Sequence, residues 1–248
     1  MKLMFAKKFA VPKSEVSPGG ALKPFHLLNM LQDAADGAVE SMNPPESYWT
    51  CGDGWMLLKY SIRLDHPLAV DDSGVINTGH VFIRDLYSAR RFILDDAEGN
   101  TFGMADSMWI FVNLKSRRPL RLSRSLPEMF FTTTEKAVFK PEFNEPKPPE
   151  RVDLSVNVQV RLGDIDMNGH VNNAYYVSWA AESLPEDVYM TCGLCGAEIL
   201  FKHEATYGMV LTVETQRDGL DFRHRITNSD GTEIAIMTTK WTKIGGKS

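Results

Sequence analysis

The sequence predicts an α+β fold in which one order of elements occurs twice: a strand, a helix, then several antiparallel strands. Apolar residues recur at three- and four-residue steps in two segments, and at two-residue steps in most of the others. A run rich in proline and charge separates two halves that show the same order. We therefore divide the chain into residues 1–125, a connector of residues 126–150, and residues 151–248.

The first half begins with an apolar segment, residues 3–11, which we expect to be a strand, followed by a helix over residues 24–42. Pro24 suits the first helical turn, and Asn43 with the two prolines after it ends the helix. Met30 and Ala34 lie on its apolar stripe, which packs as core or leaves room for a flexible hydrocarbon chain. Alternating residues predict further strands at 56–64, 75–83, 90–95 and 101–114.

The second half repeats this order. A strand is expected over residues 154–160, and a helix over residues 174–182 with Asn172 and Asn173 at its N-cap position. Four more strands follow, at residues 198–204, 209–217, 221–227 and 232–244.

Composition excludes several classes of function. The formal net charge is -5, which does not suit a surface for nucleic acid or anionic membrane. We find no signal peptide and no transmembrane span, so we expect a cytoplasmic protein. The 3 cysteines include one Cys-x-x-Cys pair, Cys192 and Cys195, which we expect to lie in a Gly-rich turn. We expect no disulfide, no metal and no cofactor.

The clearest chemical pattern lies between the strand expected over residues 154–160 and the helix expected over residues 174–182. Asp164, Asp166, Asn168 and His170 occupy every second position, so in an extended segment their side chains converge. Asp164 is better explained as a turn residue. The others, held at the start of a helix, form a plausible hydrolytic site.

The phrase from Asp166 to Asn173, DMNGHVNN, with Tyr176 and Trp179 after it, resembles the acyl-ACP thioesterases. The resemblance implies a tandem (double) hot-dog fold, in which each unit wraps a curved antiparallel sheet around a long helix. Carried over position by position, the resemblance also implies four catalytic residues, which are Asp166, Asn168, His170 and Glu204. Plant members have a cysteine directly after the glutamate, whereas this chain has Ala205, so a thiol nucleophile at that position is excluded.

Thioester hydrolysis needs an activated nucleophile and a stabilised oxyanion. The free N–H groups at the start of the second helix would polarise the carbonyl, and Asp166 would act as nucleophile or as general base. Asn168 would hydrogen-bond the carboxylate or the substrate, while His170 and Glu204 would position and deprotonate water. We expect the substrate to contact Asn172, Asn173, Met30 and Ala34. The first half has no such constellation, so we place the acyl pocket there.

Residues 115–124 contain five basic residues and no acidic one. Arg117, Arg118 and Arg121 would receive an acidic carrier protein or the phosphate of its phosphopantetheine arm. A solvated strand end explains the same run equally well.

These residues predict an enzyme that hydrolyses fatty acyl-ACP to free fatty acid and holo-ACP, ending fatty acid synthesis. The alternatives are an acyl-CoA thioesterase of the hot-dog superfamily and, less favoured, a non-catalytic acyl-binding protein. We expect acyl carrier protein as partner, neither nucleic acid nor membrane, and a monomer or a homodimer.

Overall fold

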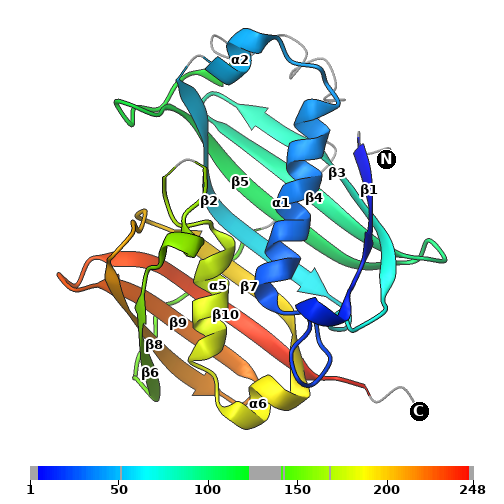
Figure 1. Cartoon of the computed structure of the whole chain (residues 1–248), viewed down its shortest axis with the longest axis vertical. Coiled ribbons are helices and arrows are strands. Elements are labelled where there is room, and N and C mark those ends of the chain that lie inside the picture. Colours follow the sequence, from blue (N-terminus) through cyan, green and yellow to red (C-terminus); the bar gives the residue numbers. More distant parts are fainter. Residues whose placement is uncertain (1–4, 51, 123–140, 142, 168, 246–248) are drawn as a thin grey trace.

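A computed structural model describes residues 5–50, 52–122, 141, 143–167 and 169–245. These residues form a 10-stranded antiparallel sheet in the order β1-β3-β4-β5-β2-β7-β10-β9-β8-β6. The two long helices, α1 and α5, pack against each other across one face of this sheet (Figure 1). The α+β class predicted from the two periodicities is therefore confirmed.

The first half supplies α1 and one side of the sheet. Helix α1 (Pro24–Glu40) begins with proline as predicted, and buries Leu31 and Ala34. Asn43 has a φ of 53°, a left-handed conformation in which a helical segment commonly ends. The other elements that are bounded within the described residues of this half are β1 (Phe5–Ala10), η1 (Lys13–Glu15), α2 (Glu46–Thr50), β2 (Asp53–Leu64), β3 (Ser73–Arg84), β4 (Tyr87–Asp96) and β5 (Thr101–Asn113).

The second half supplies α5 (Ala174–Glu182), whose bounds agree with the prediction, and the other side of the sheet. A short helix, α6 (Glu186–Thr191), was not predicted because six residues are too few to show a helical period. The remaining elements are β6 (Leu154–Gln159), η2 (Leu162–Asp164), β7 (Cys192–Phe201), β8 (Val210–Asp218), β9 (Asp221–Asn228) and β10 (Glu233–Lys243).

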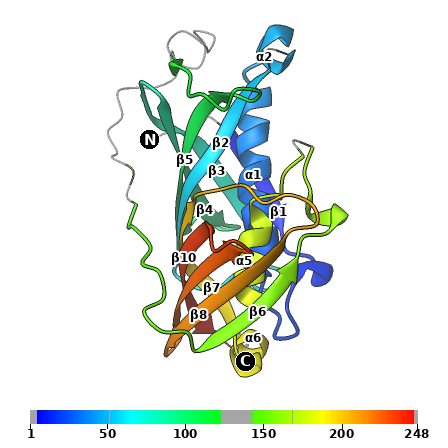
Figure 2. The same ribbon diagram turned by 90° about the vertical axis from the view of Figure 1, so that its left-hand side faces the viewer.

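The halves join edge to edge where β2 pairs with β7. Residues 59–63 of β2 lie antiparallel to residues 196–200 of β7, so the sheet continues without a break. A single core crosses this seam, with buried side chains from both halves such as Tyr60 and Ile199. The described end of the connector runs along the face opposite the helices (Figure 2). There Asn144 donates a hydrogen bond to Glu198 at 3.1 Å, beside the Ser61 hydroxyl at 2.8 Å.

Two predictions about the second half are wrong. The strand predicted over residues 198–204 begins at Cys192 and ends at Phe201, so Glu204 lies in the loop that follows. Cys192 and Cys195 lie in this strand and not in a turn, because Gly193 and Gly196 are themselves strand residues that pair with β10.

Most of the predicted connector, residues 126–150, lies outside the described residues. Its described part, residues 141 and 143–150, is neither helix nor strand. Among the described residues, no helix is both long enough and apolar enough to cross a membrane.

Candidate active site

Asp164 shapes the backbone ahead of the site. It is fully buried in the 3-10 turn η2, and its carboxylate accepts the backbone N–H of Arg161 at 2.8 Å. The guanidinium of Arg161 pairs with the same carboxylate at 3.0 Å. The backbone carbonyl of Asp164 accepts the N–H of Asn172 at 2.9 Å. The prediction that Asp164 is a turn residue is confirmed.

A tight reversal of the chain brings Asp166 and His170 together. The Asp166 N–H donates to the His170 carbonyl at 2.8 Å, and the His170 N–H donates to the Asp166 carboxylate at 3.3 Å. Gly169 adopts a φ of 82° between them, a conformation that glycine reaches without strain. Both side chains are half-buried. Asn168, predicted to be catalytic, lies outside the described residues.

The side chain that caps α5 belongs to Asn172 and not to Asn173, the residue directly before the helix. The Asn172 Oδ1 accepts the N–H of Ala174 at 2.9 Å, whereas Asn173 caps no helical N–H with its side chain. Asn172 also reaches α1, where its Nδ2 donates to Asn29 Oδ1 at 3.3 Å. Of the two asparagines predicted at the N-cap, Asn172 therefore both caps α5 and bonds to α1.

The loop after β7 brings Glu204 to the same place. Its neighbour Ala205 is fully buried and donates its N–H to the Tyr176 hydroxyl of α5 at 3.0 Å. The Ala205 carbonyl accepts the N–H of Val171 at 3.1 Å. These bonds leave the Glu204 Oε2 3.3 Å from the His170 Nε2. Two predicted catalytic residues, 34 positions apart in the sequence, are thus in contact.

Arg117 enters this cluster from the first half of the chain. Its Nη1 lies 3.0 Å from Glu204 Oε1, and its Nη2 lies 2.5 Å from Glu204 Oε2. The same Nη2 lies 2.7 Å from His170 Nε2. Sequence reasoning placed Arg117 on a carrier-binding surface and missed this contact. Arg118 and Arg121 are exposed.

The His170 Nε2 lies between a donor and an acceptor. It is 2.7 Å from a nitrogen of Arg117, whose side chain only donates hydrogen bonds, and 3.3 Å from a Glu204 oxygen, so the roles of the two ring nitrogens depend on the tautomer. Glu204, Arg117 and His170 have side chains 35%, 38% and 26% exposed, so water reaches all three. The cluster combines an imidazole and a carboxylate, groups that accept protons from water.

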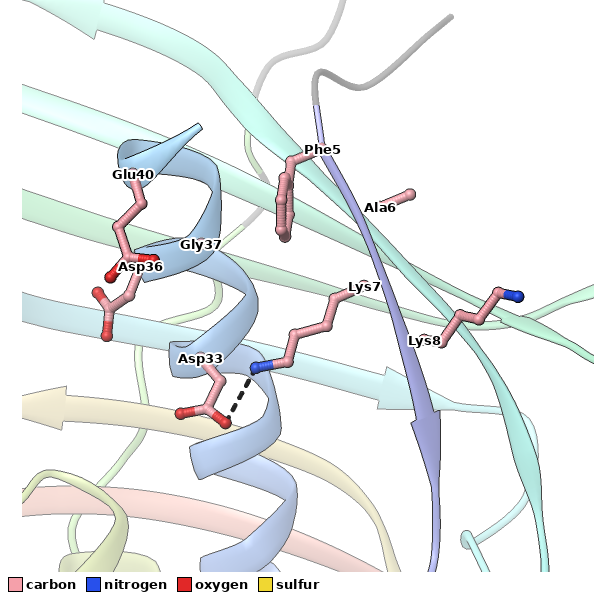
Figure 3. A pocket seen from close by; sticks show the side chains of 8 residues that line it. All are labelled: Phe5, Ala6, Lys7, Lys8, Asp33, Asp36, Gly37 and Glu40. Carbon is pink, nitrogen blue, oxygen red and sulfur yellow. Dashed lines mark hydrogen bonds and ion pairs between the residues drawn. The ribbon is translucent and has the colours of Figure 1, made fainter. Parts of the chain in front are cut away.

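The predicted substrate contacts in α1, Met30 and Ala34, differ in burial. Ala34 is fully buried in the core, whereas half-buried Met30 lines a groove between α1 and β1. A second, larger groove of about 660 Å³ lies farther along the same two elements (Figure 3). Lys7 and Asp33 form an ion pair of 3.1 Å in it, and Phe5 packs over Gly37. Neither groove contains a residue of the Arg117–His170–Glu204 cluster.

The first half also contains a buried polar cluster. Arg90 is 3% exposed, with one nitrogen 3.0 Å from His80 Nε2 and another 3.4 Å from Thr78 Oγ1. The Ser88 hydroxyl lies 2.7 Å from His80 Nδ1. Burial lowers the pKa of Arg90 to about 10 and holds the pKa of His80 well below its ordinary value. The nearby Tyr60 hydroxyl is buried with no hydrogen-bond partner among the described residues.

The two described cysteines do not form a metal site. Cys192 is buried, and Cys195 lies 3.0 Å from the Thr242 hydroxyl. Within the part of the chain that the structure describes, no group of three or more His, Cys, Asp or Glu residues is arranged to hold a metal ion.

Two family models match nearly the whole chain. The acyl-ACP thioesterase N-terminal domain matches residues 2–130, and the acyl-ACP thioesterase C-terminal domain matches residues 148–243. A chloroplastic oleoyl-acyl carrier protein thioesterase 2 of Arabidopsis thaliana is 33% identical over 285 residues, covering 96% of this chain and 77% of the relative. A chloroplastic palmitoyl-acyl carrier protein thioesterase of Cuphea hookeriana is 25% identical over 259 residues, covering 96% of this chain. This chain spans only 62% of that relative's length.

Solved structures share the fold at lower identity. An acyl-ACP thioesterase from Bacteroides thetaiotaomicron superimposes with a TM-score of 0.81 at 20% identity, covering 96% of this chain and 97% of the other. A 12:0-ACP thioesterase from Umbellularia californica gives a TM-score of 0.77 at 17% identity, covering 97% of both chains. Both superpositions therefore include the two halves of this chain.

Proposed function

The chain belongs to the acyl-ACP thioesterase family, and on that premise we propose that it hydrolyses fatty acyl-ACP to free fatty acid and holo-ACP. The observation that carries the proposal is the contact between His170 and Glu204, 3.3 Å apart in a water-accessible site. Hydrolysis adds water to the thioester carbonyl, breaks the carbon–sulfur bond and leaves a proton for the departing thiolate. The His170–Glu204 pair is suited to hold that water and to move its proton.

We propose that Asp166 and Asn168 complete the site. The reversal at Gly169 places the Asp166 carboxylate beside the backbone of His170 and ahead of α5. At that position it either attacks the carbonyl or draws a proton from water. Rapid acid quenching of a single turnover distinguishes the two roles, because only attack by Asp166 adds the mass of the acyl group to the protein. N–H groups at the start of α5 would stabilise the oxyanion.

We propose that the fold is a tandem hot-dog, with units at residues 1–125 and 151–248 around α1 and α5. The continuous sheet across β2 and β7 supports this division. Arg117 of the first unit meets His170 and Glu204 of the second, so one chain contains all three groups of the cluster. The acyl pocket would lie in the first unit, near Met30 and Ala34. Asn172 and Asn173 would contact the thioester end of the substrate.

Acyl carrier protein is the partner that this reaction requires. Exposed Arg118 and Arg121 lie close in sequence to Arg117, and we propose that they receive the acidic carrier or its phosphopantetheine phosphate. A substrate presented on CoA would carry phosphate as well, so acyl-CoA hydrolysis is the alternative function.

The test is hydrolysis of a series of acyl chain lengths, each presented both as acyl-ACP and as acyl-CoA. We expect a higher kcat/KM for acyl-ACP at the preferred chain length. Equal or better turnover of the CoA esters would replace the proposal with the alternative. Binding of acyl groups without turnover of either series would indicate a non-catalytic protein.

A further inference from the structure

We propose that Arg117 is a positioning residue, supplied by the first half of the chain to the site in the second half. It orients the Glu204 carboxylate and determines which nitrogen of His170 carries the proton. The inference deepens the proposed thioesterase function and rests on it for the reaction, but its geometry can be tested without turnover.

The contacts of Arg117 are those of a group built into the site. Its guanidinium meets both oxygens of Glu204, at 3.0 and 2.5 Å, which is the bidentate arrangement that fixes a carboxylate in plane. A carboxylate has about four lone-pair positions, so Glu204 keeps the capacity to accept a proton from water. The additional contact of 2.7 Å to His170 Nε2 links the two proposed catalytic groups through one cation.

Backbone hydrogen bonds hold the turn that contains Arg117 in place. Arg117 has a φ of 58°, which is unfavourable for a residue with a Cβ and persists where neighbouring bonds impose it. Its N–H donates to the Asn113 carbonyl at 2.8 Å, and the Asn113 N–H donates to the Arg118 carbonyl at 3.0 Å. Asn113 is tied in turn to Asp53 at the start of β2, at 2.8 Å. The turn is therefore anchored to the strand that forms the seam.

A role in binding carrier phosphate is the rival explanation for Arg117. The guanidinium of Arg117 already pairs with both oxygens of Glu204, and the neighbouring Arg118 is exposed. The two roles predict different kinetics. A positioning residue changes kcat for every thioester, while a phosphate-binding residue changes KM only for substrates that carry the phosphopantetheine arm.

The kinetic test compares Arg117→Gln and Arg117→Lys with the parent on two substrates, acyl-ACP and an acyl N-acetylcysteamine thioester, which has no phosphate. We expect Arg117→Gln to lower kcat on both by roughly 100-fold, the scale of a small misplacement of catalytic groups. Arg117→Lys should restore part of that loss, because an ammonium reaches Glu204 but cannot form the fork. The matched control is Lys115→Gln, which removes a charge from the same turn and should leave kcat on the phosphate-free thioester unchanged.

An unchanged kcat on both substrates, with a raised KM for acyl-ACP alone, would overturn the inference in favour of phosphate binding. So would equal losses in Arg117→Lys and Arg117→Gln. Circular dichroism and thermal unfolding establish that each variant is folded.

The second readout is the tautomer of His170, measured by ¹⁵N NMR of the imidazole in the full chain. We expect the proton on Nδ1 in the parent, and a shift of population toward Nε2–H in Arg117→Gln. The same tautomer in both proteins would refute the role of Arg117 at His170. Because this measurement needs no substrate, a parent that fails to hydrolyse acyl-ACP would defeat the proposed function while leaving this inference open to its own test.

Discussion

Asn172 connects the two long helices, and it does so while capping one of them. Its Nδ2 donates to Asn29 Oδ1 of α1 at 3.3 Å, and its Oδ1 accepts the Ala174 N–H of α5 at 2.9 Å. A single side chain therefore fixes both the start of α5 and its placement against the first half.

Asn172→Ala removes both bonds at once. Loss of a helix cap costs about 1 kcal/mol, so the free energy of unfolding should fall by at least that amount in denaturant titrations. Asn29→Ala loses only the bond between helices and should cost less. Asn173→Ala is the control, because the Asn173 side chain makes no capping bond. Equal stability of the Asn172 and Asn173 variants would contradict the assignment of the cap.

Asp166→Asn and Glu204→Ala test the proposed catalytic groups directly. A group that transfers a proton contributes about 10²–10⁴-fold, so each change should lower kcat on acyl-ACP by at least 100-fold. Glu233→Gln is a suitable control, because Glu233 pairs with Lys202 at the surface and lies in no proposed site. Activity within a few-fold of the parent in both site variants, measured on folded protein, would remove the site assignment.

The burial of His224 predicts that the free energy of unfolding decreases in acid. It is fully buried between the hydroxyls of Thr215 at 2.8 Å and Thr239 at 2.9 Å, and burial lowers its pKa to about 3. Below pH 6.5 the unfolded chain protonates this histidine while the folded protein does not, so stability falls as the pH falls from 6.5 toward 3. The slope from one such group is at most about 1.4 kcal/mol per pH unit.

Urea unfolding of the parent and of His224→Gln at several pH values between 4 and 7 measures that slope. The variant should show a shallower fall in stability over this range, although its stability at pH 7 is lower. Parallel pH profiles for the two proteins would mean that His224 does not contribute to the acid sensitivity.

Arg91 and Asp106 form an ion pair of 2.7 Å with side chains only 7% and 3% exposed. Breaking a buried pair leaves an uncompensated charge, so Asp106→Asn should reduce the free energy of unfolding by about 3–5 kcal/mol. Replacing both residues, as Arg91→Met with Asp106→Leu, should cost much less than the single change. A double variant at least as unstable as the single one would show that the two residues do not act as a pair.

Much of the fold is predictable because local signals agree with the packing. Pro24 and the apolar stripe define α1, and the bounds of α5 follow from asparagines ahead of an apolar run. The alternation of β6 and β9 likewise reflects one buried face, whereas β4 is buried at five successive positions. Glu204 was expected at a strand end and lies in a loop, because the bonds of Ala205 to α5 take the chain out of the sheet.

The contacts that depend on tertiary structure were not predictable. Arg117 meets Glu204 across 87 positions of sequence, through a left-handed turn that no residue type in the basic run indicates. Arg90 and Arg91 are both buried although adjacent arginines usually indicate a solvated surface. Their neighbours in space, His80 and Asp106, lie on strands to either side, which only the sheet register brings together.

The seam between β2 and β7 has a consequence for how this protein can evolve. When two identical chains pair, each contact appears twice and every substitution alters both copies. Here Ser61 pairs with Glu198, and Ser61 and Asn144 both donate hydrogen bonds to the Glu198 carboxylate. Because both halves belong to one chain, each of these contacts is present once. Each half can therefore accumulate changes that the other does not share.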